Sequence, residues 1–164
     1  MEQSFDARSG LRIAIEMERR GGEFYRRAAR VVKSPDTAAT LDVLAQDEAI
    51  HQRDFERLLA LAEARAGGQA PTDLERSAYL SAVASDLAFP GGLMSLAGEL
   101  EDVKAILRYA IQSELDAIEF YGRMVDSARQ EEERVTFQQI RSKEMDHLKR
   151  LQSMLDEVNR TAAD

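Results

Sequence analysis

Apolar residues recur along this chain at alternating steps of three and four, which is the spacing of one face of an α-helix. The first long run of this pattern is interrupted at Ser34-Pro35-Asp36, where serine favours a helix cap and proline the first turn of a new helix. Because the break is short, we expect the helices on either side to form an antiparallel hairpin over residues 11–66.

The same periodicity predicts a second helical hairpin over residues 101–159. Between the hairpins, residues 67–100 hold two segments rich in glycine and proline, "GGQAPTD" and "FPGG", which favour the ends of helices. We therefore expect a long crossover with a short helix at about 74–88. The predicted fold is all-α: one domain over residues 1–164, a four-helix bundle in up-down-down-up order.

The two hairpins are copies of one another. A shift of 96 residues (144 − 48 = 96) places Glu48 on Glu144 and His51 on His147, and no gap is needed between positions 11 and 62. The clearest matching segments are "AIEMERRGGEFY" and "AIQSELDAIEFY". Such an internal repeat indicates that one helical unit occurs twice. It also places the last helix boundary near "RQEEER", where no Gly or Pro marks it.

Polar residues stand at matching core positions of the four long helices. Each predicted inward face carries one glutamate, and two faces add a histidine three residues later: Glu18, Glu48, His51, Glu114, Glu144 and His147. A single Glu-x-x-His is common by chance and would more often be a solvated face. Four core glutamates are different, because each unpaired buried carboxylate costs several kcal/mol. Something must neutralise them.

Composition limits what can neutralise these carboxylates. No lysine or arginine falls on the inward faces near them, and the chain has no cysteine, which excludes cysteine-ligated zinc and iron–sulfur clusters. Protonation is one solution. Two divalent cations are another, because they balance four carboxylates, with one imidazole on each metal and carboxylates bridging the pair. Open oxygen and nitrogen sites suit iron or manganese better than structural zinc, although zinc can substitute.

The overall charge disfavours two classes of partner. The formal net charge is -8 and the pI about 4.9, which repels nucleic-acid phosphates and anionic lipid headgroups. The N-terminus lacks a basic region followed by an apolar run, and no stretch reaches the ~20 apolar residues that span a bilayer. We expect a soluble, cytoplasmic protein.

Taken together, these residues make the sequence resemble the rubrerythrin group of the ferritin-like superfamily and its lone-domain relatives. The resemblance rests on "AIEMERRGGEFY", "DEAIH", "SELDAIEFY" and "KEMDH", and it covers both hairpins. It implies a ferritin-like bundle with a carboxylate-bridged di-iron centre that reacts with peroxide or dioxygen, and it makes the six residues above the metal ligands. It also implies that the hydroxyls of Tyr25 and Tyr121 donate to ligand carboxylates across the bundle, whereas the alternative is a pair of core aromatics.

Two features depart from the rubrerythrin pattern. Without cysteine the chain has no rubredoxin module, so the electrons for peroxide reduction would come from a separate donor protein. Ala117 stands where rubrerythrins tend to carry a further carboxylate, a difference that bears on the peroxide chemistry rather than on the metal site.

Several neighbouring residues allow two interpretations. Asp47, four residues before His51, is either a partner for the ring nitrogen not on the metal or a solvated side chain, and its counterpart Lys143 cannot accept such a bond. Gly21-Gly22 indicates close helix packing or, alternatively, room for a ligand beside Glu18.

Glu23 and Glu119 are repeated but fall off the inward faces, so they are not among the expected metal ligands, and salt bridges between the hairpins are one role open to them. The leading function is a di-iron oxidoreductase active in oxidative stress. The alternative is a ferroxidase or a partner in iron storage, and a metal-free interaction module comes last. A homodimer is expected, and exchange of a hairpin between protomers remains open.

Overall fold

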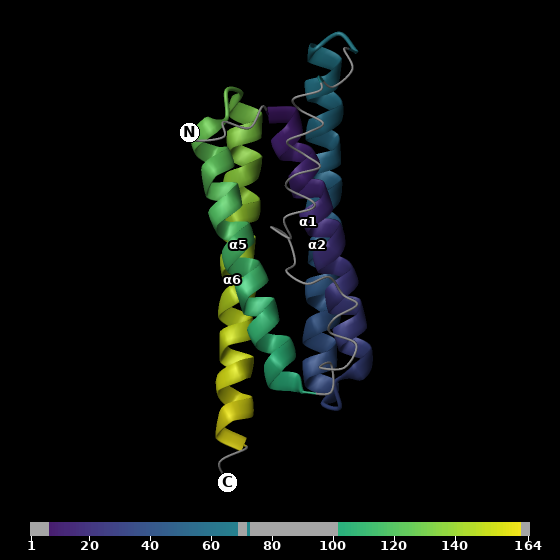
Figure 1. Cartoon of the computed structure of the whole chain (residues 1–164), viewed down its shortest axis with the longest axis vertical. Helices are drawn as coiled ribbons and strands as arrows, with labels where there is room; N and C mark the ends of the chain where they lie inside the picture. The colour runs from purple at the N-terminus through teal and green to yellow at the C-terminus, as the bar shows by residue number, and fades with distance from the viewer. Residues whose placement is uncertain (1–6, 69–71, 73–101, 162–164) are drawn as a thin grey trace.

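The computed structural model describes residues 7–68, 72 and 102–161, and the structural statements below concern these residues. They form four α-helices, α1 (Ala7–Val31), α2 (Pro35–Arg65), α5 (Val103–Ser127) and α6 (Glu131–Thr161). Figure 1 shows them as two hairpins, α1–α2 and α5–α6, that lie side by side along their length. The predicted short helix at about 74–88 falls outside the described residues, as does most of the crossover.

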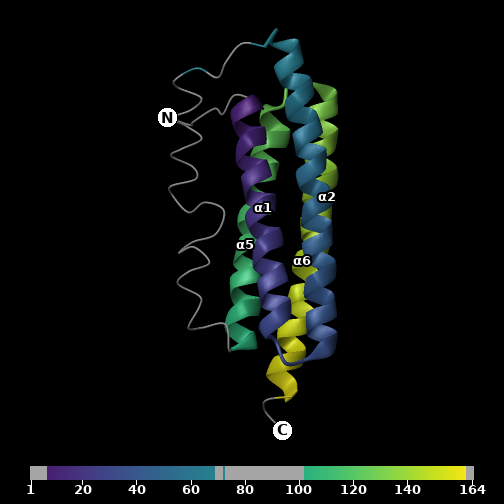
Figure 2. The same cartoon turned by 90° about the vertical axis from the view of Figure 1, so that its right-hand side faces the viewer.

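The helices run in the predicted up-down-down-up order. In Figure 1, α1 and α6 descend while α2 and α5 rise, as the colour bar shows. Across the two hairpins, α1 packs beside α5 and α2 beside α6 (Figure 2). This arrangement turns the inward faces of both copies toward one axis, so equivalent residues of the repeat meet near the middle of the bundle.

Local chemistry explains where the helices begin and end. Ser34 caps α2 by accepting a hydrogen bond from the backbone N–H of Thr37, and Pro35 occupies the first turn, as predicted. At its other end, α2 is followed by Gly67 and Gly68 with φ of 65° and 73°, left-handed values that glycine adopts without strain. Three glutamates open α6 at Glu131–Glu133, where negative charge favours a helix N-terminus.

The core follows the predicted inward faces. On α2, the apolar members of the face are fully buried: Leu41, Leu44, Phe55 and Leu58. Three of the four equivalent positions of α6 are buried as well, Phe137, Ile140 and Leu151, and the fourth, Met154, is partly buried. In α1 and α5 the buried surface is wider than one stripe, because Phe24 and Phe120 are also enclosed. No helix among the described residues is long and apolar enough to cross a membrane.

Candidate metal centre

The six sequence-predicted ligands meet in one buried cluster between the hairpins. They fall into two overlapping groups whose ligand atoms lie within 4.8 Å of one another: Glu18, Glu48, His51 and Glu144, and Glu48, Glu114, Glu144 and His147. Glu48 and Glu144 belong to both groups. Each group therefore has one histidine, one glutamate of its own and two shared glutamates, which is the layout of a carboxylate-bridged pair of metal ions.

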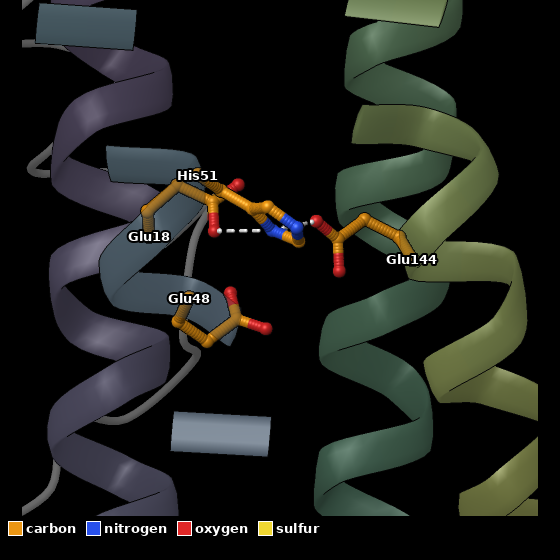
Figure 3. A group of neighbouring side chains, drawn as sticks. All are labelled: Glu18, Glu48, His51 and Glu144. Carbon is orange, nitrogen blue, oxygen red and sulfur yellow. Dashed lines mark ion pairs between the residues drawn. The ribbon is translucent and has the colours of Figure 1, made fainter. Parts of the chain in front are cut away.

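The histidines reach across from one hairpin to the other. His51 Nδ1 on α2 lies 2.8 Å from Glu144 Oε1 on α6 and 3.4 Å from Glu18 Oε2 (Figure 3). His147 Nδ1 lies 3.1 Å from Glu48 Oε1 and 2.9 Å from Glu144 Oε2. The two imidazole rings stack with centroids 5.6 Å apart. Neither hairpin could build this cluster alone.

The oxygen and nitrogen atoms that could bind metal face one another without forming hydrogen bonds. Within the described residues, six of these buried atoms have no hydrogen-bond partner: Glu18 Oε2, Glu48 Oε1, His51 Nδ1, Glu144 Oε1, Glu144 Oε2 and His147 Nδ1. A buried polar atom left unpaired costs roughly 1–3 kcal/mol. Oxygen and imidazole nitrogen atoms that converge in this way suit divalent metal ions, and the residues present fit such a group.

The histidines carry positive charge when no metal is bound. Burial alone would lower the pKa of His51, but its contacts with Glu144 and Glu18 outweigh burial and raise the pKa to about 10. The pKa of His147 is raised in the same way by its surrounding glutamates. Burial would raise the pKa of Glu144, yet the two imidazolium rings lower it to about 2. Protons thus occupy positions that a metal would take, and metal binding must release them.

The remaining carboxyl groups are pushed toward their neutral form. Burial, then the charges of Glu144 and Glu18, raise the pKa of Glu48 well above its usual value. Burial and the charge of Glu144 raise the pKa of Glu114 to about 8. Four carboxyls at this density cannot all ionise without compensating charge, because like charges at short range disfavour each other's ionised form.

The two predicted tyrosines donate across the bundle. Tyr25 on α1 donates to Glu114 on α5, and Tyr121 on α5 donates to Glu18 on α1. Burial and the nearby carboxylates raise the pKa of both hydroxyls well above the usual value, which keeps the protons on the phenols. The pair of contacts obeys the same 96-residue shift as the ligands.

A small cavity adjoins the cluster between α1 and α5. Its volume is about 20 Å³, enough for roughly one water molecule. Three ligand carboxylates and both tyrosines line it, together with small or flexible side chains: Met17, Gly21, Ser113 and Ala117. Sequence reasoning missed Met17 and Ser113, although the repeat pairs them (17 + 96 = 113).

The adjacent glycines Gly21 and Gly22 of α1 serve different purposes. A Cβ at Gly22 would lie 3.5 Å from Glu48 Cβ and 3.6 Å from the Ala45 carbonyl, so Gly22 packs closely on α2. Gly21 lines the small cavity beside Glu18. Each interpretation offered for the pair therefore describes one of the two residues.

The structure corrects two expectations about charged neighbours. Asp47 does not contact His51 of its own helix; its Oδ2 lies 3.2 Å from Nε2 of His147 in the other hairpin. Helical spacing could not reveal this partner, because the contact depends on how the hairpins meet. Among the described residues, Glu23 and Glu119 form no salt bridges between hairpins; they pair along their own helices with Arg19 and Arg123.

Comparisons with known proteins agree with the fold. No family model matches this sequence, and no curated protein matches it. Among solved structures, it is similar to the crystal structure of a Thermotoga maritima protein assigned as a ferritin-like diiron-carboxylate protein. The TM-score is 0.69 at 22% sequence identity, over 94% of this chain and 97% of the other. The chain therefore has the ferritin-like four-helix fold, as predicted.

Proposed function

We propose that this chain is a di-iron carboxylate protein of the rubrerythrin type, which reduces peroxide or dioxygen with electrons from a separate donor protein. One observation carries the proposal: six buried oxygen and nitrogen atoms from both hairpins converge with no hydrogen-bond partner among the described residues. The structurally similar Thermotoga maritima protein, which is described as diiron-carboxylate, supports the same choice of cofactor.

In this proposal the two groups of ligand atoms suggest a place for each ligand around the two irons. Glu48 and Glu144 would bridge, since they belong to both groups of donors. Glu18 and His51 would complete one position, and Glu114 and His147 the other. One chain supplies all of these residues, so a hairpin from a second protomer is not required.

We take the small cavity, which has room for roughly one water molecule, as the side of the cluster where peroxide or dioxygen would approach. Reduction of one peroxide molecule takes up two electrons and two protons, breaks the O–O bond and yields two waters. A bound di-iron centre would deliver the two electrons at once, and an external donor would restore them. The hydroxyls of Tyr25 and Tyr121 hold protons at the cavity wall and fix one oxygen each of Glu114 and Glu18.

Loss of a bridging carboxylate tests the proposal. Glu48→Ala and Glu144→Ala should each lose most of the bound iron and the peroxide consumption, because each glutamate belongs to both groups of donors. Glu23→Ala is the matched control, since Glu23 pairs with Arg19 on the same helix outside the cluster. The measurements are iron content and peroxide consumption with an artificial reductant, on protein loaded with iron.

Two results would count against an oxidoreductase. Iron-loaded protein that consumes peroxide or oxygen no faster than Glu48→Ala, with several reductants tried, would leave iron handling as the better account. Wild-type protein that binds no iron would remove the di-iron proposal itself.

A second candidate is oxidation of ferrous iron as part of iron handling. It is favoured by a hollow between α2 and α6 that reaches His51 and carries the carboxylates of Asp47 and Asp54 on its wall. Ferrous iron added in air, without a reductant, separates the two functions. A ferroxidase turns over many irons per chain, whereas a peroxide-reducing enzyme stops when its own centre is oxidised.

A further inference from the structure

We propose that the two metal positions of this centre are unequal: the position at His147 is held firmly through Asp47, and the position at His51 exchanges metal with solvent. This inference rests on the proposed di-metal centre and concerns how each position is supported. The six ligands repeat under the 96-residue shift. The residues that could support each histidine ring from behind, which means from the side away from the ligand glutamates, do not repeat.

Behind His147 stands a carboxylate. Its Nδ1 faces the ligand glutamates, while its Nε2 lies 3.2 Å from Asp47 Oδ2. With a metal on Nδ1, the ring would carry its proton on Nε2 and donate a hydrogen bond to Asp47. Such a contact fixes the orientation of the ring and raises its basicity as a ligand. Because Asp47 is on α2 and His147 on α6, the contact also ties the two hairpins together.

Behind His51 the equivalent residue is a lysine. The shift that relates the hairpins places Lys143 at the counterpart of Asp47 (47 + 96 = 143). Lys143 lines the same hollow as His51, and an ammonium group has no lone pair to accept a ring N–H. Within the described part of the chain, Nε2 of His51 has no acceptor, and Asp54 on the same wall forms no ion pair with it. Nothing there orients this ring from behind.

The two histidines also differ in their access to solvent. A hollow of about 580 Å³ between α2 and α6 is lined by His51, Asp47, Asp54, Lys143 and neighbouring residues, and its lining does not include His147. The hollow reaches the ring of His51 and none of the other ligands, so water has a path to this ring from the side away from the ligand glutamates. At the His147 position the ring is backed by Asp47 instead.

These differences predict two steps of metal binding in a fixed order. Loss of a partner behind a histidine ligand typically lowers metal affinity 10–100-fold. We expect the first metal to bind at His147, at least about 10-fold more tightly than the second. The metal at His51 is then the one that leaves first during dialysis or brief treatment with a chelator.

Cobalt titration of the full-length, metal-free protein followed by proton NMR tests the order directly. The chain has only two histidines, so at most two imidazole N–H signals can be shifted by paramagnetic Co²⁺. One equivalent should produce a single slowly exchanging signal, from His147. The second equivalent should bind more weakly and add no sharp signal, because the N–H of His51 exchanges with water.

Two variants assign the signals and test the cause. Asp47→Ala should remove the slowly exchanging signal and weaken the first step about 10-fold. Lys143→Asp should add a second such signal and tighten the second step about 10-fold. Each has a control with the same change of charge: Asp42→Ala on the exposed face of α2, and Lys149→Asp, which lines a different hollow. Both controls should leave the two steps unchanged.

The outcomes separate this inference from the proposed function. Binding of two cobalt ions with equal affinity, or an Asp47→Ala variant that behaves like Asp42→Ala, overturns the inequality and leaves the di-metal centre intact. Protein that binds no cobalt overturns both.

Discussion

At the scale of single residues, the cluster depends on donors that come from the opposite hairpin. The hydroxyl of Tyr121 supplies the only hydrogen bond within the described residues to Glu18 Oε1, and Tyr25 does the same for Glu114. Both tyrosines and both glutamates are almost fully buried. Water is therefore a poor replacement for either donor.

We expect Tyr121→Phe to lower the free energy of unfolding of the metal-free protein by about 1–3 kcal/mol, the cost of a buried acceptor left unpaired. Tyr25→Phe is the matched variant and should cost a similar amount, because it affects Glu114 in the same way. Urea unfolding of the three proteins measures the difference. Unchanged stability in both variants would mean that these hydrogen bonds do not support the cluster.

The shifted pKa values predict how stability depends on pH. His51 keeps its proton in the folded state up to about pH 10, against an ordinary pKa of 6.5, so its contribution is full below pH 6.5 and is lost as the pH rises toward 10. Glu114 acts in the same direction between its ordinary 4.5 and about 8, because the folded state binds the proton more tightly. Glu144 has the opposite sign, but only between about 2 and 4.5.

The metal-free protein should therefore become less stable from pH 5 to pH 9. The slope is up to about 1.4 kcal/mol per pH unit for each proton involved. Urea unfolding at pH 5, 7 and 9 measures it, and Glu114→Gln should make the profile shallower because it removes one of the titrating groups. A free energy of unfolding that is constant or increases over this range would contradict the assigned shifts.

At the scale of helices, two glycines test how closely the elements approach. A Cβ at Gly22 meets ordinary contact distances to α2, 3.5 Å to Glu48 Cβ, and its tightest neighbour is the mobile end of Arg26. A Cβ at Gly10 would lie 2.1 Å from Cε of Met124 on α5, which is buried. The first site accepts a methyl group, whereas the second does not without a shift of Met124.

We expect Gly22→Ala to stabilise the protein by roughly 0.5–1 kcal/mol, the gain in helix propensity. Gly10→Ala should destabilise it, since overpacking of a core commonly costs about 1–3 kcal/mol. Thermal unfolding of the two variants beside the wild type checks both signs. If both substitutions stabilise, α1 and α5 are less tightly packed than described.

The helices themselves were predictable from local chemistry and from the repeat. Ser34-Pro35 marked the first break through its capping chemistry, and the inward faces followed from periodicity alone. The gap between α5 and α6 has no Gly or Pro, and only the shift from the first hairpin located it. The partner of Asp47 and the pairing of Glu23 were not predictable, because they depend on the relative rotation and height of helices, which periodicity does not determine.

At the scale of the whole molecule, the centre both joins and strains the two hairpins. Glu48 is 5% exposed, and burial and the charges of Glu144 and Glu18 disfavour the ionised form of its carboxyl. Without metal the cluster is costly, because burial and neighbouring carboxylates keep carboxyls such as that of Glu48 from their usual ionised form. With metal the same residues connect α1 and α2 to α5 and α6.

Glu48→Ala should therefore have opposite effects in the two states. In the metal-free form it should be at least as stable as the wild type, because it removes a repelled carboxyl. Metal should stabilise the wild type over its own metal-free form by about 2.7 kcal/mol when free metal is 100-fold above the dissociation constant. With metal present, the wild type should therefore be more stable than Glu48→Ala. Thermal unfolding with and without a chelator measures all four states, and a variant less stable than wild type in the chelator would contradict the argument.

The crossing of contacts between the hairpins has a consequence for the history of the chain. Each histidine contacts a glutamate of the other copy, and each tyrosine donates to the other copy. A single hairpin with this sequence pattern would have worked only as a pair of identical molecules. Within one chain the two copies are free to differ wherever a residue does not meet its equivalent across the axis. Asp47 and Lys143 are such a pair: they hold equivalent positions of the repeat with opposite charge, so the departure from symmetry lies just outside the ring of ligands.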